Sequence, residues 1–207
     1  MPDDGSAEPR NAPTESVTAR HREILQTAAQ LICRYGYEAT PMQRIAEACG
    51  LTKAGLYHHI HSKEHLLAEI MNFGMDIFEE QVLSPVLPIK DPLERLKVCM
   101  QRHVRLVTGG RAKEITVILH EHATPNGDAY RRIAERKKRY VRFLESSFED
   151  AAAQDLTRPI NPRVAAFAFL GTVNWIYKWF RPDGAISADQ LSHDMQDLFF
   201  GGVERRS

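Results

Sequence analysis

The sequence predicts an all-α fold of about nine helices, with an N-terminal three-helix head and a larger helical C-terminal domain. Apolar residues recur at helical spacing in almost every segment after Thr18. A capping residue stands directly before proline, as is typical of helix starts, at Thr40-Pro41, Asp91-Pro92 and Asn161-Pro162. Residues 113–122 contain a β-branched run, but no partner strand is evident for it, so we expect a helix there too.

The first helix is expected to follow a disordered tail. Residues 1–16 are rich in proline, acidic residues, glycine and serine and show no apolar period. The helical period begins at Thr18, with Ile24, Ala28 and Tyr35 on one face, and Gly36 is expected to end it. This helix would pack on the two short helices that follow and complete a head of residues 17–62.

Two short amphipathic helices are expected between residues 40 and 63, separated by a tight Cys49-Gly50-Leu51 corner. Thr40 can cap the first helix, and Thr52 can cap the second. Gly50 supplies the left-handed residue that ends the first. In the second, Leu56 and Ile60 face the core, and the outward residues are Lys53, Ala54, Tyr57 and His58. This arrangement is typical of a DNA-binding helix-turn-helix.

The rest of the chain, residues 63–207, predicts a C-terminal domain of long helices. Ser62 can cap a connecting helix, residues 63–83, that leads out of the head. Ser187 and Gln190 can form a capping box for the last helix. The segment 162–180 is apolar almost all round, so it needs cover from more than one direction. The remaining helices are expected at residues 92–108, 113–122, 126–153, 162–180 and 187–200.

Composition excludes several classes of protein. The 207 residues are 43% apolar and balance 27 basic against 27 acidic side chains, which argues against a surface coated in positive charge. No segment is apolar enough to span a bilayer or to form a signal peptide, so we expect a cytoplasmic protein without membrane contact. The 3 cysteines form no CxxC pair, which indicates neither disulfides nor a thiolate metal site.

Enzymatic chemistry is not expected. The sequence contains no GxSxG, GxxxxGKS/T or HExxH motif, and its glycines stand at helix ends. His120-Glu121-His122 does not predict a metal site, because residues two apart on a helix point in different directions. We therefore expect no cofactor and no metal.

The helix-turn-helix segment resembles the N-terminal domain of TetR-family transcriptional regulators over residues 18–66. The one departure is Ile60, which stands where an aromatic residue is usual in the family. The matching residues are Thr40, Ile45-Ala46, Gly50, Gly55, Leu56-Tyr57, His59, Ser62-Lys63 and Leu66.

The resemblance implies a repressor that binds double-stranded operator DNA. Thr40, Tyr57 and Lys63 would contact phosphates, and Lys53, Ala54 and His58 would lie nearest the bases. Gly55 would allow close approach to DNA or, alternatively, close packing on the first helix. The DNA-binding set is Thr40, Thr52, Lys53, Ala54, Gly55, Tyr57, His58 and Lys63.

A second resemblance concerns the effector. The segment NWIYKWFRPDG, residues 174–184, is similar to the penultimate helix of TetR-type regulators that sense acyl-coenzyme A thioesters. It implies a C-terminal site for a small apolar effector, formed by Met100, His103, Val104, Asn174, Trp175, Lys178, Trp179 and Arg181. The basic cluster from Arg131 to Arg142 would hold a phosphate or be a solvated surface. A sensor of hydrophobic drugs that controls efflux, and a helical adaptor without DNA binding, are the alternatives.

We also expect a homodimer, because two heads related by a two-fold axis can occupy successive major grooves of a palindromic operator. The helices 162–180 and 187–200 would pair with their symmetry mates as a four-helix bundle. The expected interface residues are Phe167, Leu191, Met195, Leu198 and Phe199.

Overall fold

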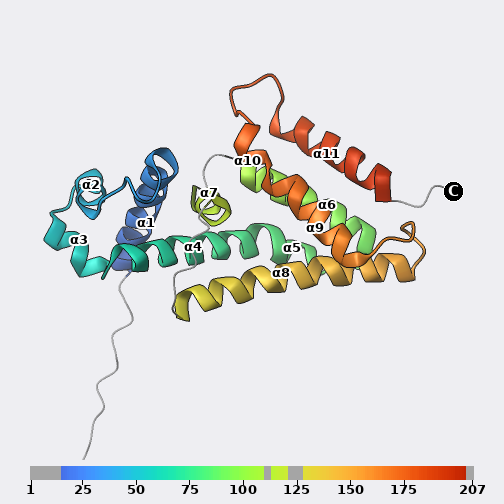
Figure 1. Cartoon of the computed structure of the whole chain (residues 1–207), viewed down its shortest axis with the longest axis horizontal. Helices are drawn as coiled ribbons and strands as arrows, with labels where there is room; N and C mark the ends of the chain where they lie inside the picture. Colours follow the sequence, from blue (N-terminus) through green and yellow to red (C-terminus); the bar gives the residue numbers. More distant parts are fainter. Residues whose placement is uncertain (1–14, 110–112, 121–127, 204–207) are drawn as a thin grey trace, which may run out of the picture.

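The computed structural model describes residues 15–109, 113–120 and 128–203, and these residues confirm the all-α class. They form the α-helices α1 to α11 and one π-helical segment, η1, and no strand occurs among them. Two helical paths are divided into shorter segments, α4 with η1 and α5, and α9 with α10 (Figure 1). Joining each path leaves nine helices, as the sequence predicts.

The head consists of α1 (Glu15–Tyr35), α2 (Met42–Ala48) and α3 (Lys53–His59). Its core includes Ile24, Ala28, Ile45, Leu56 and Ile60, all with 0% of their surface exposed. The first helix begins at Glu15, three residues before the expected Thr18, and the rest of the expected tail, residues 1–14, lies outside the described residues. Gly36 ends α1 with a φ of +85°, where a side chain would strain the backbone.

The structure corrects the expected cap of α2. Pro41 occupies the N-cap position, and no side chain caps this helix. The Thr40 hydroxyl instead donates to the carbonyl oxygen of Gly36 at 2.7 Å, and the residue is fully buried. Thr40 therefore closes the loop between α1 and α2, and the capping pattern was misleading because a nearby carbonyl outcompeted the helix N-terminus.

The connecting helix is a continuous path with a change of helix type. Ser62 caps α4 (Lys63–Phe78) by accepting from the His65 amide at 3.0 Å, as expected. The path continues as η1 (Glu79–Leu83) and α5 (Ser84–Val86). At η1 the amide of Ser84 donates to the carbonyl of Glu79, five residues earlier, in place of the usual four. Figure 1 shows α4 joining the head to the C-terminal domain.

The C-terminal domain continues with α6 (Pro92–Thr108), α7 (Lys113–His120) and α8 (Asp128–Ala153). Asp91 caps α6 through the amides of Leu93 and Glu94 at 2.8 and 3.0 Å, as expected. The β-branched segment is helical over the described part of its length, residues 113–120. Its packing explains this outcome, because α7 lies against both α1 and α4 and the described residues offer no strand to pair with it.

The last part comprises α9 (Pro162–Asn174), α10 (Ile176–Trp179) and α11 (Ala188–Val203). Asn161 caps α9 as expected. The Ser187 hydroxyl accepts from the Gln190 amide at 3.1 Å, which is one half of the expected capping box, whereas the Gln190 side chain donates to Asp194 at 2.7 Å. The expected single helix over residues 162–180 is wrong, since it breaks at Trp175. The helix covers α6 and α8 with one side and leaves Val164 and Phe167 exposed on another.

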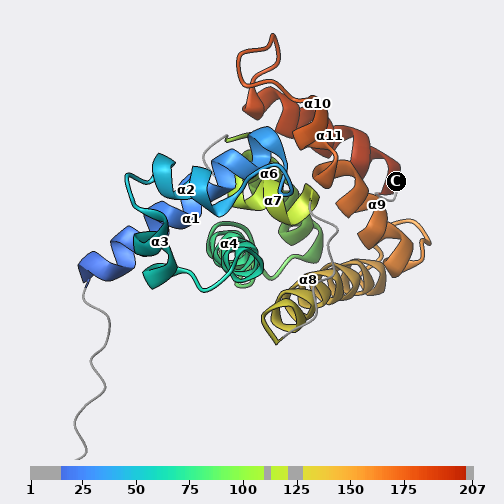
Figure 2. The ribbon, with the colours of Figure 1, turned by 60° about the vertical axis from the view of Figure 1, so that its left-hand side comes forward.

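The crossing of α4 and α7 is close at Gly74, which lies inside α4, so the expectation that the glycines stand at helix ends is wrong for this residue. A Cβ atom at this glycine would lie 2.7 Å from Cδ1 of Ile118 and 3.1 Å from the backbone carbonyl carbon of Glu114. Figure 2, in which α4 is seen nearly end-on, shows α7 close to both α4 and α1. The seventh helix therefore connects the head with the interior of the C-terminal domain.

Candidate functional site

The exposed face of α3 carries the residues expected to meet DNA. Lys53, Ala54, Tyr57 and His58 are exposed, whereas Leu56 is fully buried on the opposite face. The Thr52 hydroxyl caps α3 by accepting from the Gly55 amide at 3.0 Å, as predicted. Gly50, with a φ of +65°, forms the corner before it. The helix is therefore fixed on one side and presents polar side chains on the other.

Gly55 does not pack against the first helix. A Cβ atom at this position would lie 3.2 Å from Oγ1 of Thr52 and 3.9 Å from the side chain of Leu51. The missing side chain thus leaves room for the capping hydroxyl of the same helix, so one of the two expected roles of this glycine is excluded.

Lys63 stands in the first turn of α4 and is held in place by the loop before α2. Its Nζ lies 4.3 Å from the ring centroid of Tyr37 and 3.4 Å from the carbonyl oxygen of Glu38, to which it donates. A lysine held over an aromatic ring loses less side-chain entropy when it binds an anion than a freely moving lysine does. The helix N-terminus adds a favourable field for the same anion.

Side chains of α1 fix the head to its neighbours. Arg20 donates to the carbonyl of Cys49 at the corner of the helix-turn-helix. Nε2 of His21 lies 3.1 Å from Glu69 of α4, and Nδ1 of His65 lies 3.3 Å from the same carboxylate. The first helix therefore holds the corner of the helix-turn-helix and is itself held to α4.

A cavity of about 330 Å³ lies inside the C-terminal domain, between α4, α6, α7, α8 and α9. Its wall is largely apolar, with a few polar side chains, which is the usual character of a small-molecule site. The lining residues are Met75, Phe78, His103, Ile115, Ile118, Leu119, Lys137, Tyr140, Val141, Leu170 and Asn174.

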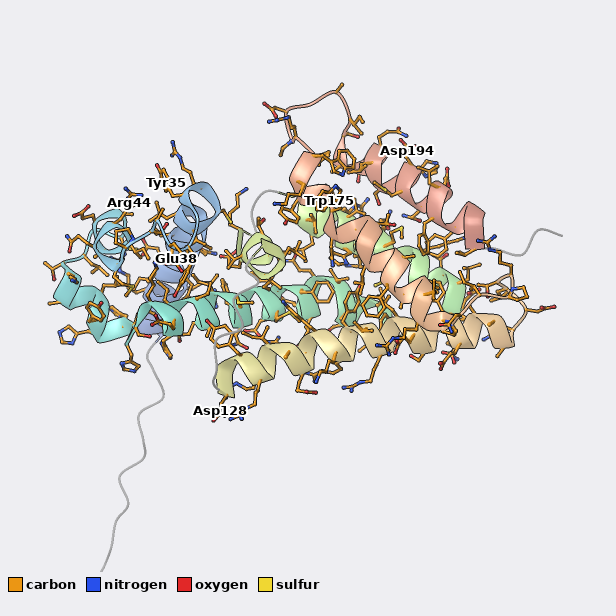
Figure 3. The ribbon with its side chains drawn as sticks, in the orientation of Figure 1. Tyr35, Glu38, Arg44, Asp128, Trp175 and Asp194 are labelled. Carbon is orange, nitrogen blue, oxygen red and sulfur yellow. The ribbon has the colours of Figure 1, made fainter. Side chains whose placement is uncertain are left out.

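Two of the expected effector residues line this cavity, His103 and Asn174. Met100 and Val104 are fully buried in the core and are not part of its wall. The others are exposed on the surface and do not line it: Trp175, Lys178, Trp179 and Arg181. The helix breaks at Trp175, labelled in Figure 3, directly after Asn174.

The sequence did not identify the contributions of α7 and α8 to the cavity wall. Ile115 and Ile118 belong to the β-branched segment, whose inner face no periodicity argument could identify. Tyr140 stands at helical spacing with the apolar residues of α8, and its hydroxyl is the signal that this face of the helix reaches a polar site.

A buried polar network forms part of the cavity wall. Oη of Tyr140 lies 3.2 Å from Nδ1 of His103 and 3.3 Å from Sγ of Cys99. Desolvation lowers the pKa of His103 to about 3 and raises that of Cys99 to about 12. Burial, then the nearby Cys99, raises the pKa of Tyr140 above its ordinary range. All three groups are therefore uncharged at neutral pH.

Two further polar groups belong to the wall. Lys137 donates to the carbonyl of Ile118 in the last turn of α7 at 3.2 Å, and desolvation lowers the pKa of its amine. Oδ1 of Asn174 is buried and has no hydrogen-bond partner among the described residues. A buried polar atom without a partner is costly, so this amide offers a hydrogen bond to a ligand.

The basic cluster of α8 is mostly engaged in ion pairs within the protein. Arg136 binds Asp76 at 2.7 Å and Glu79 at 2.8 Å, and it also donates to the carbonyl of Asn72. Arg131 and Lys138 pair with acidic residues of their own helix. The central arginine therefore fastens α8 to the connecting path, and the expected phosphate-binding role does not apply to it.

An apolar face on α9 and α11 is exposed to solvent. Val164, Phe167 and Leu198 have 60%, 51% and 78% of their surface exposed. Of the other expected interface residues, Leu191 is buried, Met195 is half-buried, and the Phe199 ring packs against Phe148, Phe169 and Phe200. Phe167 and Leu198 are thus the members of the expected set that are most available to a partner.

Comparison with known proteins identifies the family. A model described as "Bacterial regulatory proteins, tetR family" matches residues 24–70, and one described as "Tetracyclin repressor-like, C-terminal domain" matches residues 90–203. The chain belongs to the TetR family. TetR regulators are dimers, and the helix-turn-helix formed by α2 and α3 is their DNA-binding element.

Two solved TetR structures are particularly similar. The structure of AibR in complex with isovaleryl coenzyme A and operator DNA is 56% identical, with a TM-score of 0.85, and the match covers 88% of this chain and 99% of that one. The structure of PfmR from Thermus thermophilus is 31% identical, with a TM-score of 0.78 and coverages of 88% and 99%.

Curated TetR-type relatives are more distant and are regulators by name. The transcriptional repressor KstR2 of Mycolicibacterium smegmatis is 25% identical over 192 residues, covering 89% of this chain and 91% of that protein. The fatty acid metabolism regulator protein of Bacillus subtilis is 21% identical over 189 residues, covering 90% and 97%.

Membrane-spanning helices and clusters of metal ligands are both absent from the described residues. None of the helices in the described part combines the length and hydropathy needed to span a bilayer. Within the same residues, no group of three or more histidine, cysteine or acidic side chains is arranged to hold a metal. Of the His120-Glu121-His122 triplet, Glu121 and His122 lie outside the described residues.

Proposed function

We propose that this TetR-family protein is a transcriptional repressor that binds a palindromic operator as a homodimer and is released by a short acyl-coenzyme A thioester. The observation that carries the two ligands of the proposal is the 56% identity to AibR, whose solved complex contains both isovaleryl coenzyme A and operator DNA. Release by the effector is inferred from the link that α4 forms between the two sites. The protein is accordingly a cytoplasmic regulator without enzymatic activity.

The cavity supports an effector with a small acyl group. Its volume of about 330 Å³ lies at the lower end of the range usual for small-molecule sites. A branched acyl chain of a few carbons fits within such a space and leaves room for the adjoining part of the thioester. Its apolar wall would bury the acyl chain, and Lys137 would lie near a polar part of the ligand.

On the DNA side, we assign phosphate contacts to Tyr57 and Lys63 and base contacts to Lys53, Ala54 and His58. Thr52 and Gly55 remain in the proposed DNA-binding set, because they lie at the N-terminus of α3, where backbone amides would face the duplex. Thr40 is removed from the set of direct contacts, because its side chain is fully buried and already bound to Gly36.

The connecting helix supplies a mechanical link between the two sites. Its first turn carries Lys63, and its last turn carries Met75 and Phe78, which line the cavity. A ligand that wedges the cavity open would displace this end of α4 and the helix α7 that packs on it. The separation of the two heads would then change, so ligand and operator oppose each other reciprocally.

The test uses a fluorescent DNA fragment from the region upstream of the protein's own gene. We expect retarded, sequence-specific complexes, and release by isovaleryl-coenzyme A but not by free coenzyme A. Release by uncharged hydrophobic compounds alone would support the drug-sensor alternative. Absence of specific DNA binding would favour the adaptor and contradict the proposal.

A further inference from the structure

The cavity wall contains a histidine whose two ring nitrogens have different surroundings. Nδ1 of His103 lies 3.2 Å from Oη of Tyr140, and no hydrogen-bond partner of Nε2 is found among the described residues. Since His103 lines the cavity and Nδ1 is engaged, Nε2 is the nitrogen left for a ligand. What Nε2 offers that ligand depends on the tautomer of the ring.

The neighbours of His103 determine this tautomer. Tyr140 has one hydroxyl proton and two candidate acceptors, the imidazole nitrogen and the sulfur of Cys99. An imidazole nitrogen is a much stronger acceptor than a thiol sulfur, so the hydroxyl donates to Nδ1 of His103. Because Nδ1 then accepts, the proton of the neutral imidazole lies on Nε2. The thiol of Cys99 can in turn donate to Oη of Tyr140.

The ring is also fixed in orientation and charge. The rings of Phe78 and His103 form a T-shaped pair with centroids 5.1 Å apart. His103 has only 3% of its surface exposed. Because burial lowers the pKa of the imidazole and keeps it neutral, the donor on Nε2 does not depend on pH in the physiological range. An N–H group held this way costs little reorganisation when it binds an acceptor.

We propose that His103 donates a hydrogen bond from Nε2 to the thioester carbonyl oxygen of the effector, and that Tyr140 and Cys99 position it as a donor. This inference rests on the proposed function, because it assumes an acyl thioester in the cavity. The apolar wall would contact the acyl chain. His103 would distinguish a thioester from a molecule of the same shape that lacks the carbonyl.

The ligand test compares isovaleryl-coenzyme A with S-(3-methylbutyl)-coenzyme A, a thioether in which a methylene replaces the carbonyl. We expect calorimetry to show roughly tenfold weaker binding of the thioether to the wild type, because the buried N–H loses its acceptor. His103→Leu should bind both ligands equally. His103→Gln should retain the preference, because its amide can accept from Tyr140 and still donate to the carbonyl.

Val141→Ala is the matched control, since it trims the cavity wall without touching a polar group. It should weaken both ligands by the same factor and leave their ratio unchanged. An undiminished preference in His103→Leu would overturn the inference and leave the proposed function standing. Failure of both ligands to bind the wild type would overturn the proposed function and the ligand role of His103 together.

A second measurement tests the tautomer without any ligand. Nitrogen-15 spectra of histidine-labelled wild-type protein should show the proton of His103 on Nε2, and Tyr140→Phe should yield a mixture of tautomers. A proton on Nδ1 in the wild type would overturn the positioning role of Tyr140, whatever the effector is.

Discussion

Lys53 and Lys63 carry the same charge but have different surroundings in the head. Lys53 is exposed in the first turn of α3, whereas Lys63 is held over the Tyr37 ring beside the carbonyl of Glu38. A fixed cation near the helix N-terminus suits a phosphate, which is the same at every base pair. An exposed lysine on the recognition helix suits base edges.

We therefore expect Lys63→Ala to weaken binding to all duplexes about equally and to lower the slope of log K against log salt by about 1. Lys53→Ala should in addition reduce the preference for operator over random DNA. Fluorescence anisotropy over a salt series, with both duplexes, measures the two effects. Equal loss of preference in both variants would contradict the division of roles.

The buried imidazole of His103 also predicts a pH dependence of stability. Its pKa is about 3 in the folded protein and 6.5 ordinarily, so the unfolded chain binds a proton first as pH falls. The stabilisation is complete above pH 6.5 and is lost below it, with a limiting slope of about 1.4 kcal/mol per pH unit. Between about pH 7 and pH 5, the free energy of unfolding measured with urea should fall more steeply for the wild type than for His103→Gln. Parallel pH dependences of the two proteins would contradict this prediction.

At the scale of elements, the sequence predicted what local chemistry decides. The caps at Thr52, Ser62, Asp91 and Asn161 are formed as expected, because each depends only on a side chain and the next few amides. The glycine corner at Gly50 has the same local origin.

Features set by tertiary packing were predicted less well. The buried contact of Thr40 with Gly36 and the break at Trp175 depend on neighbours that no short window contains. The cavity wall combines five helices, so periodicity could identify which side of α6 and α9 faces inward but not which side chains meet. For that reason His103 and Asn174 were found and Tyr140 and Lys137 were not recognised as site residues.

The crossing of α4 and α7 yields a stability prediction. Gly74→Ala places a methyl group 2.7 Å from Cδ1 of Ile118, so we expect a loss of about 1–3 kcal/mol despite the better helix propensity of alanine. Gly201→Ala is the control, because a Cβ there meets nothing within 4 Å. Chemical denaturation should show Gly201→Ala neutral or stabilised. If the two variants changed the free energy of unfolding equally, α4 and α7 would be able to move apart at little cost.

The ion pairs that join Arg136 of α8 to Asp76 and Glu79 of the connecting path yield a second stability prediction. Arg136→Ala removes the contacts to Asp76 and Glu79, and we expect a loss of about 1–2 kcal/mol at neutral pH. The hydrogen bond from Arg136 holds the pKa of Glu79 below 4.5, so this stabilisation is present above pH 4.5 and is lost as pH falls through the lowered pKa. Exposed Arg142→Ala should change stability little, and urea titrations at about pH 7 and about pH 3.5 check both statements.

At the scale of the whole molecule, the exposed apolar face of α9 and α11 explains why one chain is not the functional unit. Phe167 and Leu198 lie on the outer side of helices whose inner sides pack on α6 and α8. The ring contact between Phe169 of α9 and Phe199 of α11 places the two helices side by side, and we expect their exposed apolar residues to meet a partner together. A dimer formed there would carry its two heads at the far ends of the two α4 helices.

We expect Phe167→Glu and Leu198→Glu to shift the protein to monomers and to weaken operator binding by about a hundredfold or more, since two linked heads bind far more tightly than one. Leu87→Glu is the control, because Leu87 is 58% exposed but belongs to the end of the α4 path. Sedimentation at micromolar concentration measures the oligomeric state of each variant. If both interface variants remained dimers, the interface would have to be formed by another surface.

The π-helical turn at η1 has a consequence for how insertions and deletions are tolerated. A turn closed over five residues holds one residue more than an α-helical turn, so everything after it is rotated by about 100° relative to an unbroken α-helix. Val82 and Val86 are buried in that rotated frame. Deleting Glu80 should restore a regular α-helix and keep this apolar pair buried, because the lost residue is the one that the wide turn accommodates. Inserting one residue after Glu80 should instead rotate the pair by about 100° toward water. Thermal unfolding of the two length variants should therefore differ sharply, although each changes the chain by a single residue.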